Sequence, residues 1–196
     1  MTTADQISPK TNPWRDTAQR YGLVSRILHW AMAYLLIWQF VGLLTWKIFG
    51  DSPIARTVSS LGPSHGAVGL LVFVLVMVRA AWWLSGRSGR PPHASGWEGR
   101  AALLAHVTLY GLMFAIPALA LLRSYGGGKG WKIGAVQLIP ETGVKVAWMI
   151  APADRLHGLL AWGLSILILG HIGMALVHRF VRKDGTLARM AGSLRA

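Results

Sequence analysis

Four long apolar stretches constrain the fold of this chain more than any other feature. Each contains 19 to 22 residues, and they cover residues 27–46, 66–84, 101–122 and 156–177. A helix of roughly 20 apolar residues crosses the hydrocarbon core of a membrane, and in lipid only a helix or a closed barrel satisfies its own backbone groups. Unbroken apolar runs lack the alternation of a barrel strand. The sequence therefore predicts an all-α integral membrane protein, a bundle of four spanning helices.

The remaining composition agrees with this fold class. Only 14% of the 196 residues are charged, whereas a soluble domain carries about 25%. Residues 1–20 form a polar tail with no removable signal peptide, residues 21–190 form one membrane domain, and residues 191–196 form a short second tail. The chain contains no cysteine, which excludes disulfides, iron–sulfur clusters and thiolate ligands.

The net charge of +13 indicates membrane orientation rather than nucleic-acid binding. One side of the predicted bundle carries 12 basic residues: Lys10, Arg15, Arg20, Arg26, Arg87, Arg90, Arg100, Arg179, Arg182, Lys183, Arg189 and Arg195. The other side carries 7: Lys47, Arg56, Arg123, Lys129, Lys132, Lys145 and Arg155. Because the more basic loops stay in the cytoplasm, we expect both termini there.

Histidines are the residues in the spans that can carry chemistry. Five of the seven lie within or at the edge of an apolar stretch: His29, His65, His106, His157 and His171. Ionisable groups inside a membrane are costly and often functional. A single buried histidine is as well explained by an interhelical hydrogen bond as by binding to a metal. The relative depths of the five histidines distinguish the two roles.

The fourth span places two histidines on one face at two depths. His157 and His171 are 14 residues apart, which corresponds to about 40° around a helix and about 21 Å along it. The depth of His29 in the first span matches His171, and the depth of His65 in the second span matches His157. Paired imidazoles inside a bundle suit the two axial positions of a haem iron. The pattern therefore predicts two haems in the bundle interior.

Small residues flank these histidines and have two interpretations. They either let helices pack closely or leave room for a flat macrocycle, and they are Gly66, Gly69, Gly158, Gly170 and Gly173. Arg79 lies 14 residues after His65. Its guanidinium either reaches the inner membrane surface or binds a haem propionate.

Three further histidines have less specific roles. His178 lies seven residues beyond His171, where it is either an interfacial residue or part of a quinone headgroup site. His106 is expected to donate or accept an interhelical hydrogen bond rather than to bind iron. His93 is an ordinary loop residue.

Several segments together resemble the bacterial cytochrome b561 family over residues 21–190. They are SRILHW, GPSHGAVGLLVFVLVMVRAAWW, LLAHVTLYGLMFAIP, RLHGLLAWGLSILILGHIGMALVHRF and RKDGTLARM. The resemblance implies a four-helix inner-membrane cytochrome with two b-type haems that exchanges electrons with quinone. His29, His65, His157 and His171 match the haem ligands of that family. Its members include a superoxide oxidase that reduces ubiquinone. This chain departs from the family in its longer N-terminal tail and in the outer segment GGGKGWKIG.

Three functions remain open at this stage. The first is a quinone-linked oxidoreductase that oxidises periplasmic superoxide or another small anionic donor. The second is a haem-bearing membrane anchor for a separate dehydrogenase or hydrogenase subunit, and the third is a transporter or channel with structural histidines. The outer connections favour an anionic donor, because their 7 basic residues exceed Asp51, Glu141 and Asp154 by four charges. Lys129, Lys132 and Lys145 are the candidates for attracting it.

Overall fold

Among the residues that the structure describes, four helices are long and apolar enough to cross a membrane, as predicted. The computed structural model describes residues 12–86, 89–92 and 95–192. The spanning helices are α1 (Leu23–Phe49), α3 (His65–Ser85), α4 (Gly96–Gly126) and α5 (Ala147–Leu176), and α5 continues into the π-helix η2 (Val177–Arg182). His93, Lys10, Arg87 and Arg195 lie outside the described residues.

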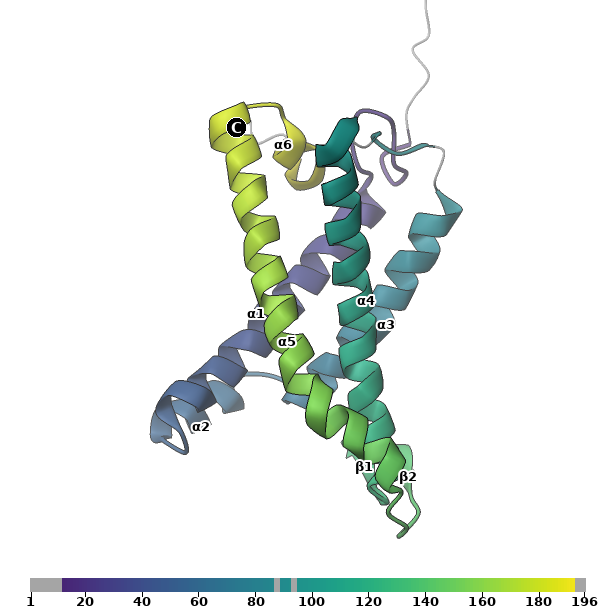
Figure 1. Ribbon diagram of the computed structural model, residues 1–196, viewed down its shortest axis with the longest axis vertical. Coiled ribbons are helices and arrows are strands. Elements are labelled where there is room, and N and C mark those ends of the chain that lie inside the picture. Colours follow the sequence, from purple (N-terminus) through teal and green to yellow (C-terminus); the bar gives the residue numbers. More distant parts are fainter. Residues whose placement is uncertain (1–11, 87–88, 93–94, 193–196) are drawn as a thin grey trace, which may run out of the picture.

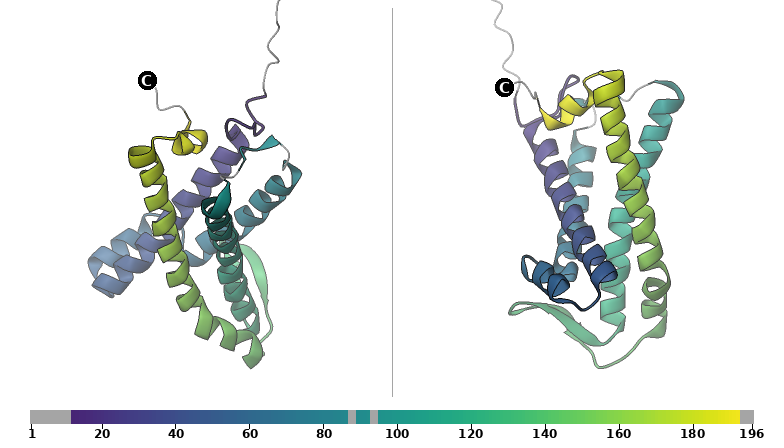
Figure 2. Two further views of the ribbon diagram at one scale, coloured as in Figure 1. Left: turned by 45° about the horizontal axis from the view of Figure 1, so that its top comes forward. Right: turned by 90° about the vertical axis from the view of Figure 1, so that its left-hand side faces the viewer.

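The helices form an open bundle in which neighbours in sequence pack on one another. Helix α1 packs on α3, α3 on α4, and α4 along much of α5. Figure 1 shows the N-terminal segment and helix α6 (Thr186–Ala191) at one end, here called the terminal end. A β-hairpin of β1 (Lys129–Ile133) and β2 (Val136–Glu141) lies at the opposite end, here called the hairpin end (Figures 1 and 2).

The spanning helices extend beyond the apolar stretches that predicted them. Helix α4 has 31 residues, or about 46 Å at 1.5 Å per residue, against a hydrocarbon core about 30 Å thick. Both α4 and α5 contain an internal proline, Pro117 and Pro152 respectively. Few large apolar side chains are buried inside the bundle, and many of them are exposed on its outside. An apolar exterior is the surface that a lipid bilayer requires.

A small buried core holds α3 against α4. Helix α3 contributes Val68, Val72 and Val76, which recur every four residues on one face. Helix α4 contributes Leu109, Met113 and Ile116 at the spacing of a facing stripe, and Met32 and Leu164 complete the cluster. This core lies between the two levels at which the histidines were expected.

The connection between α4 and α5 contains a two-stranded sheet that the sequence analysis did not predict. Strands β1 and β2 pair antiparallel, with Trp131 opposite Ile139 and a bulge between Trp131 and Lys132. The short helix α2 (Pro53–Ser60) joins α1 to α3 at the same end. Its N-cap residue is Ser52, whose side chain accepts a hydrogen bond from the Ala55 backbone N–H. The hairpin adds a small β element to an otherwise helical chain.

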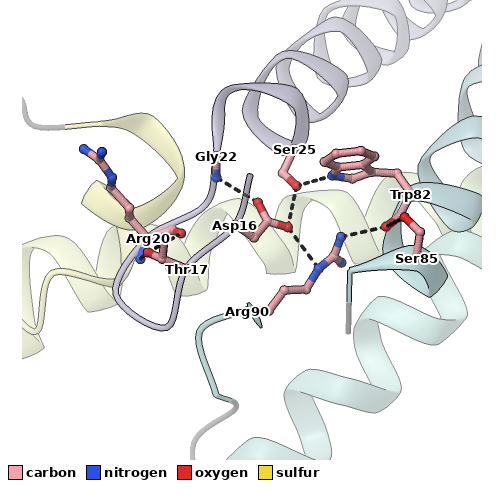
Figure 3. Close-up of polar contacts among 8 residues, drawn as sticks. All are labelled: Asp16, Thr17, Arg20, Gly22, Ser25, Trp82, Ser85 and Arg90. Carbon is pink, nitrogen blue, oxygen red and sulfur yellow. Dashed lines mark hydrogen bonds and ion pairs between the residues drawn. The ribbon is translucent and has the colours of Figure 1, made fainter. Parts of the chain in front are cut away.

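At the terminal end, a buried carboxylate joins three parts of the chain (Figure 3). Asp16 accepts hydrogen bonds from the Gly22 backbone N–H and the Ser25 hydroxyl, both at 2.8 Å, and pairs with Arg90 at 3.0 Å. The Trp82 indole N–H donates to the same Ser25 hydroxyl at 2.9 Å. The side chains of Asp16 and Arg90 are only 4% and 14% exposed. The N-terminal segment is therefore fixed to α1, α3 and the connection after α3.

The C-terminal helix α6 is attached to the same region through α1. Arg26 donates from Nε to the Met190 carbonyl at 3.1 Å and from Nη2 to the Ala191 carbonyl at 2.8 Å. A guanidinium suits this position because the last carbonyls of a helix have no partner within the helix. The Tyr21 backbone N–H donates to the Arg189 carbonyl at 3.2 Å, so both ends of the described chain meet at α1.

Removing the Asp16 carboxylate is expected to destabilise the bundle. In an Asp16→Ala variant the buried Arg90 guanidinium loses its counter-charge, which costs about 3–5 kcal/mol of unfolding free energy. The measurement is denaturant unfolding in detergent, followed by circular dichroism. The control is Asp51→Ala, because the Asp51–Arg56 pair is 62% and 68% exposed and such pairs contribute little. Equal losses in the two variants would contradict the role given to Asp16.

Candidate functional site

The four histidines matched by depth come together in two pairs. His29 of α1 faces His171 of α5 with ring centroids 6.2 Å apart and planes inclined by 64°. His65, the first residue of α3, faces His157 of α5, also at 6.2 Å and with planes inclined by 61°. The first pair lies toward the terminal end and the second toward the hairpin end. Helix α5 contributes one histidine to each pair.

The spacing of both pairs fits one metal ion between two rings. An imidazole nitrogen binds a first-row metal at about 2.0–2.1 Å, and the ring centroid lies about 1.1 Å behind that nitrogen. Two imidazoles on opposite sides of an ion therefore have centroids roughly 6.3 Å apart. Among the described residues, no group of three or more His, Asp or Glu side chains is arranged to hold a metal. The pairs therefore suit an iron whose other four ligands come from a macrocycle.

At the hairpin end, the second nitrogen of one imidazole has a backbone partner. His157 Nδ1 lies 3.2 Å from the carbonyl oxygen of Ile116 in α4. A carbonyl only accepts, so the contact requires the proton on Nδ1 and leaves Nε2 free as a metal ligand. Metal-binding histidines usually have such a partner, which fixes the tautomer and the ring orientation. Helix α4 thus orients a ring that α5 carries.

A largely apolar pocket opens beside this pair. It has about 910 Å³ of space free of protein atoms, and this volume includes the open solvent at its mouth. Its wall includes both histidines of the pair together with Leu36, Leu43, Gly69 and Leu121. A flat apolar group with a metal at its centre fits this wall and these donors.

One polar residue of this pocket was missed by the sequence analysis. Gln39 of α1 donates from Nε2 to the His65 carbonyl at 3.1 Å. Its Oε1 is buried and has no hydrogen-bond partner among the described residues. A buried acceptor without a donor is costly, so this oxygen is available to a donor in the pocket. The signal was present in the sequence, because Gln39 is the only amide side chain in the stretch 27–46.

The terminal-end pair has charged and aromatic neighbours instead. Arg79 Nη1 lies 3.1 Å from His29 Nδ1, and its guanidinium stacks over the Tyr110 ring at 5.5 Å. The ring of His106 on α4 lies 5.4 Å from that of His171. A guanidinium only donates hydrogen bonds, so His29 Nδ1 must accept in this arrangement. A metal bound to His29 Nε2 would place the proton on Nδ1, and Arg79 would then need another acceptor.

The structure places His178 apart from the two pairs, in the π-helix η2. Its Nδ1 lies 2.6 Å from a carboxylate oxygen of Asp184. Hydrogen bonds from Thr186, foremost its backbone N–H, and from His178 hold the pKa of Asp184 well below its ordinary value. Single π-turns within α-helices are frequent at functional sites. His178 therefore belongs to a polar cluster at the terminal end, beyond His171.

Three of the flanking glycines are not explained by close packing. A Cβ added at Gly158, Gly170 or Gly173 would meet nothing within 4 Å among the described residues. At Gly69 a Cβ would only touch the Gln39 side chain at 3.7 Å. The α5 glycines were interpreted either as sites of close helix packing or as sites that leave room for a flat macrocycle. The structure agrees with the second interpretation, because the space in front of these glycines is open.

Histidine pairs at two levels of a four-helix membrane bundle are typical of membrane cytochromes, and this fold and site indicate that class. The family model for prokaryotic cytochrome b561 matches residues 20–193. The chain belongs to this family, and it is therefore a membrane electron-transfer protein whose cofactor is haem b.

Individual relatives are similar over nearly their whole length. Cytochrome b561 homolog 2 of Escherichia coli K12 is 30% identical over 181 residues, which cover 90% of this chain and 94% of the relative. Cytochrome b562 of Cereibacter sphaeroides is 30% identical over 172 residues, covering 83% and 89%. A protein of Yersinia pestis named probable superoxide oxidase CybB is 27% identical over 178 residues, covering 88% and 96%.

Proposed function

We propose that this cytochrome is a self-contained oxidoreductase of the bacterial inner membrane that oxidises superoxide at the hairpin end and reduces ubiquinone. The observation that carries the proposal is the pair of 6.2 Å histidine separations, because α5 joins the two levels within one chain. The reaction balances when two superoxide anions leave as dioxygen. Their two electrons, with two protons, convert one ubiquinone to ubiquinol.

The proposal includes two haem b groups per chain. His29 and His171 would hold one, and His65 and His157 the other. When bound, each haem iron supplies a one-electron ferric–ferrous couple whose potential depends on its axial ligands and surroundings. Arg79 would leave His29 Nδ1 and bind a propionate, because a charge-assisted bond to a carboxylate offsets the cost of a guanidinium inside the membrane.

We place the hairpin end in the periplasm and both termini in the cytoplasm. The basic side chains at the hairpin end support an anionic donor there. Arg56 pairs with Asp51, and Arg123 with Asp154, which neutralises two of the three acidic residues. The exposed lysines that remain include Lys129, Lys132 and Lys145, and a positive surface raises the encounter rate of a small anion. We assign ubiquinone to the terminal end, near His178 and Arg79.

The first test of this proposal is haem stoichiometry. The purified chain is expected to contain roughly two haems, and His65→Ala and His29→Ala roughly one each, because a six-coordinate iron loses one of two protein ligands. The measurement is the pyridine haemochrome spectrum per mole of protein. The control is His93→Ala, which removes a histidine outside both pairs. A parent content near one, or full content in both pair variants, would refute the assignment.

The second test is topology. A fluorescent reporter that matures only in the cytoplasm is expected to be active at the C-terminus and inactive when inserted after Gly134, in the hairpin turn. The expectation follows from the 12-to-7 distribution of basic residues. The reverse pattern would place the hairpin in the cytoplasm and would exclude a periplasmic donor at that end.

The third test is the salt dependence of reduction by superoxide. Replacing Lys129, Lys132 and Lys145 together by Gln is expected to slow haem reduction about 3- to 10-fold at low ionic strength, and salt should remove the difference. The measurement is haem absorbance after a superoxide pulse with ubiquinone present. The matched control carries Arg20→Gln, Arg179→Gln and Lys183→Gln at the terminal end.

Two outcomes would change the proposal. Reduction no faster than in a haem-free sample would reject superoxide as the donor. Reduction only in the presence of a co-purifying dehydrogenase or hydrogenase would instead support the membrane-anchor role.

A further inference from the structure

The β-hairpin contributes one half-buried aromatic side chain to the wall of the hairpin-end pocket. Trp131 of β1 lines the pocket together with His65 and His157. Its indole lies against the first turn of α3, where a Cβ added at Gly66 would be 3.1 Å from Trp131 Cζ2. A glycine directly after His65 thus allows the indole to lie close to the histidine pair.

The base of the hairpin is held by backbone hydrogen bonds. The Gly126 carbonyl accepts from the Val146 N–H at 2.8 Å, and the Gly128 carbonyl accepts from the N–H groups of Thr142 and Gly143 at 3.1 and 2.9 Å. These bonds join the end of α4 to the segment that enters α5. The hairpin therefore begins and ends on the helix pair that carries His157.

Two glycines of the outer segment permit this close attachment. Gly128 has φ +72°, and a Cβ there would lie 2.5 Å from the Val144 carbonyl oxygen. Gly130 has φ +67°, and its Cβ would lie 2.9 Å from the Ile139 carbonyl oxygen. Only glycine adopts such dihedrals without strain, and here the space is closed as well. The glycine-rich segment thus fixes the strand that carries Trp131.

Contacts across the hairpin hold the backbone of Trp131. Its strand partner Ile139 is buried, and the Gln137 side chain donates to the Trp131 carbonyl at 3.4 Å. Lys129 and Lys132 lie on either side of Trp131 in β1, and both are exposed. The positive charges that would attract an anion therefore flank, along β1, the indole that lines the pocket.

We infer that Trp131 is a specificity-determining residue, a fixed cover on the wall of the hairpin-end pocket that lets small donors reach the haem held there and excludes larger ones. The identity of the small donor rests on the proposed function, whereas the cover is a property of the protein chain. A rigid backbone attachment favours a size filter over a moving gate, because the hairpin is tied to α4 and α5 at both of its ends.

The absence of native cysteine allows a direct test by thiol labelling of the haem-loaded protein. Ser124 lines the same pocket, and Ser124→Cys is close to isosteric. A small methanethiosulfonate is expected to label this variant at least 10-fold faster than a bulky maleimide of the same charge. Adding Trp131→Ala should raise the maleimide rate at least 10-fold and change the methanethiosulfonate rate less than twofold.

Two control variants make the result specific. Trp148→Ala removes an exposed indole at the same end, from the first turn of α5, and should leave both labelling rates unchanged. Gly66→Ala requires the indole to shift by only a few tenths of an ångström, so it should change the maleimide rate less than twofold. A maleimide rate that Trp131→Ala does not change would overturn the inference.

The same variants separate this inference from the proposed function. Trp131→Ala is also expected to speed haem reduction by bulky reductants such as a reduced phenylenediamine. If labelling depends on Trp131 but superoxide does not reduce the protein, the role of Trp131 as a size filter is supported and superoxide is rejected as the electron donor. If superoxide reduces the protein but the labelling rates do not depend on Trp131, superoxide is supported as the electron donor and the role of Trp131 as a size filter is rejected.

Discussion

The geometry of both candidate sites depends on the helical phase of α5. His157 and His171 are separated by almost four full turns, so one face of a single helix presents imidazoles at two depths. Helices α1 and α3 then supply one partner each, His29 and His65, at the matching levels. Because an apolar bundle offers few alternative partners to an imidazole, the position of α1 and α3 relative to α5 is linked to the positions of these rings.

The two levels are built from different chemistry. At the terminal end, Arg79 and His106 surround the pair, and the buried Asp16 carboxylate ties the chain together nearby. At the hairpin end, the pocket is mostly apolar, and its polar contacts come from Gln39 and the Ile116 carbonyl. Two irons with identical axial ligands would therefore experience different electrostatic surroundings, which is a means of separating their reduction potentials.

The apolar stretches and the spacing of the histidines predicted the helices of this structure and which histidines lie at the same depth. The four spans follow from the bilayer thickness, and the histidine pairing follows from depth along straight helices. The Asp16–Arg90 contact joins residues 74 positions apart in polar segments, where no periodicity operates. The hairpin was missed because its strands contain glycine and proline and lack a clean alternation. The partner of Arg79 was also missed, since depth places Arg79 and His29 at one level but does not fix the direction of either side chain.

Glycine shows most clearly why sequence alone leaves such questions open. At Gly128 and Gly130 the backbone needs a positive φ and the space is closed. At Gly66 the dihedrals are ordinary, and the missing side chain matters because an indole from another element occupies its place. At Gly158 and Gly170 no described residue outside the adjoining helix backbone comes within 4 Å of an added Cβ, so these glycines leave open space beside α5. One residue type thus has three physical roles here, and only the atoms in front of each Cα distinguish them.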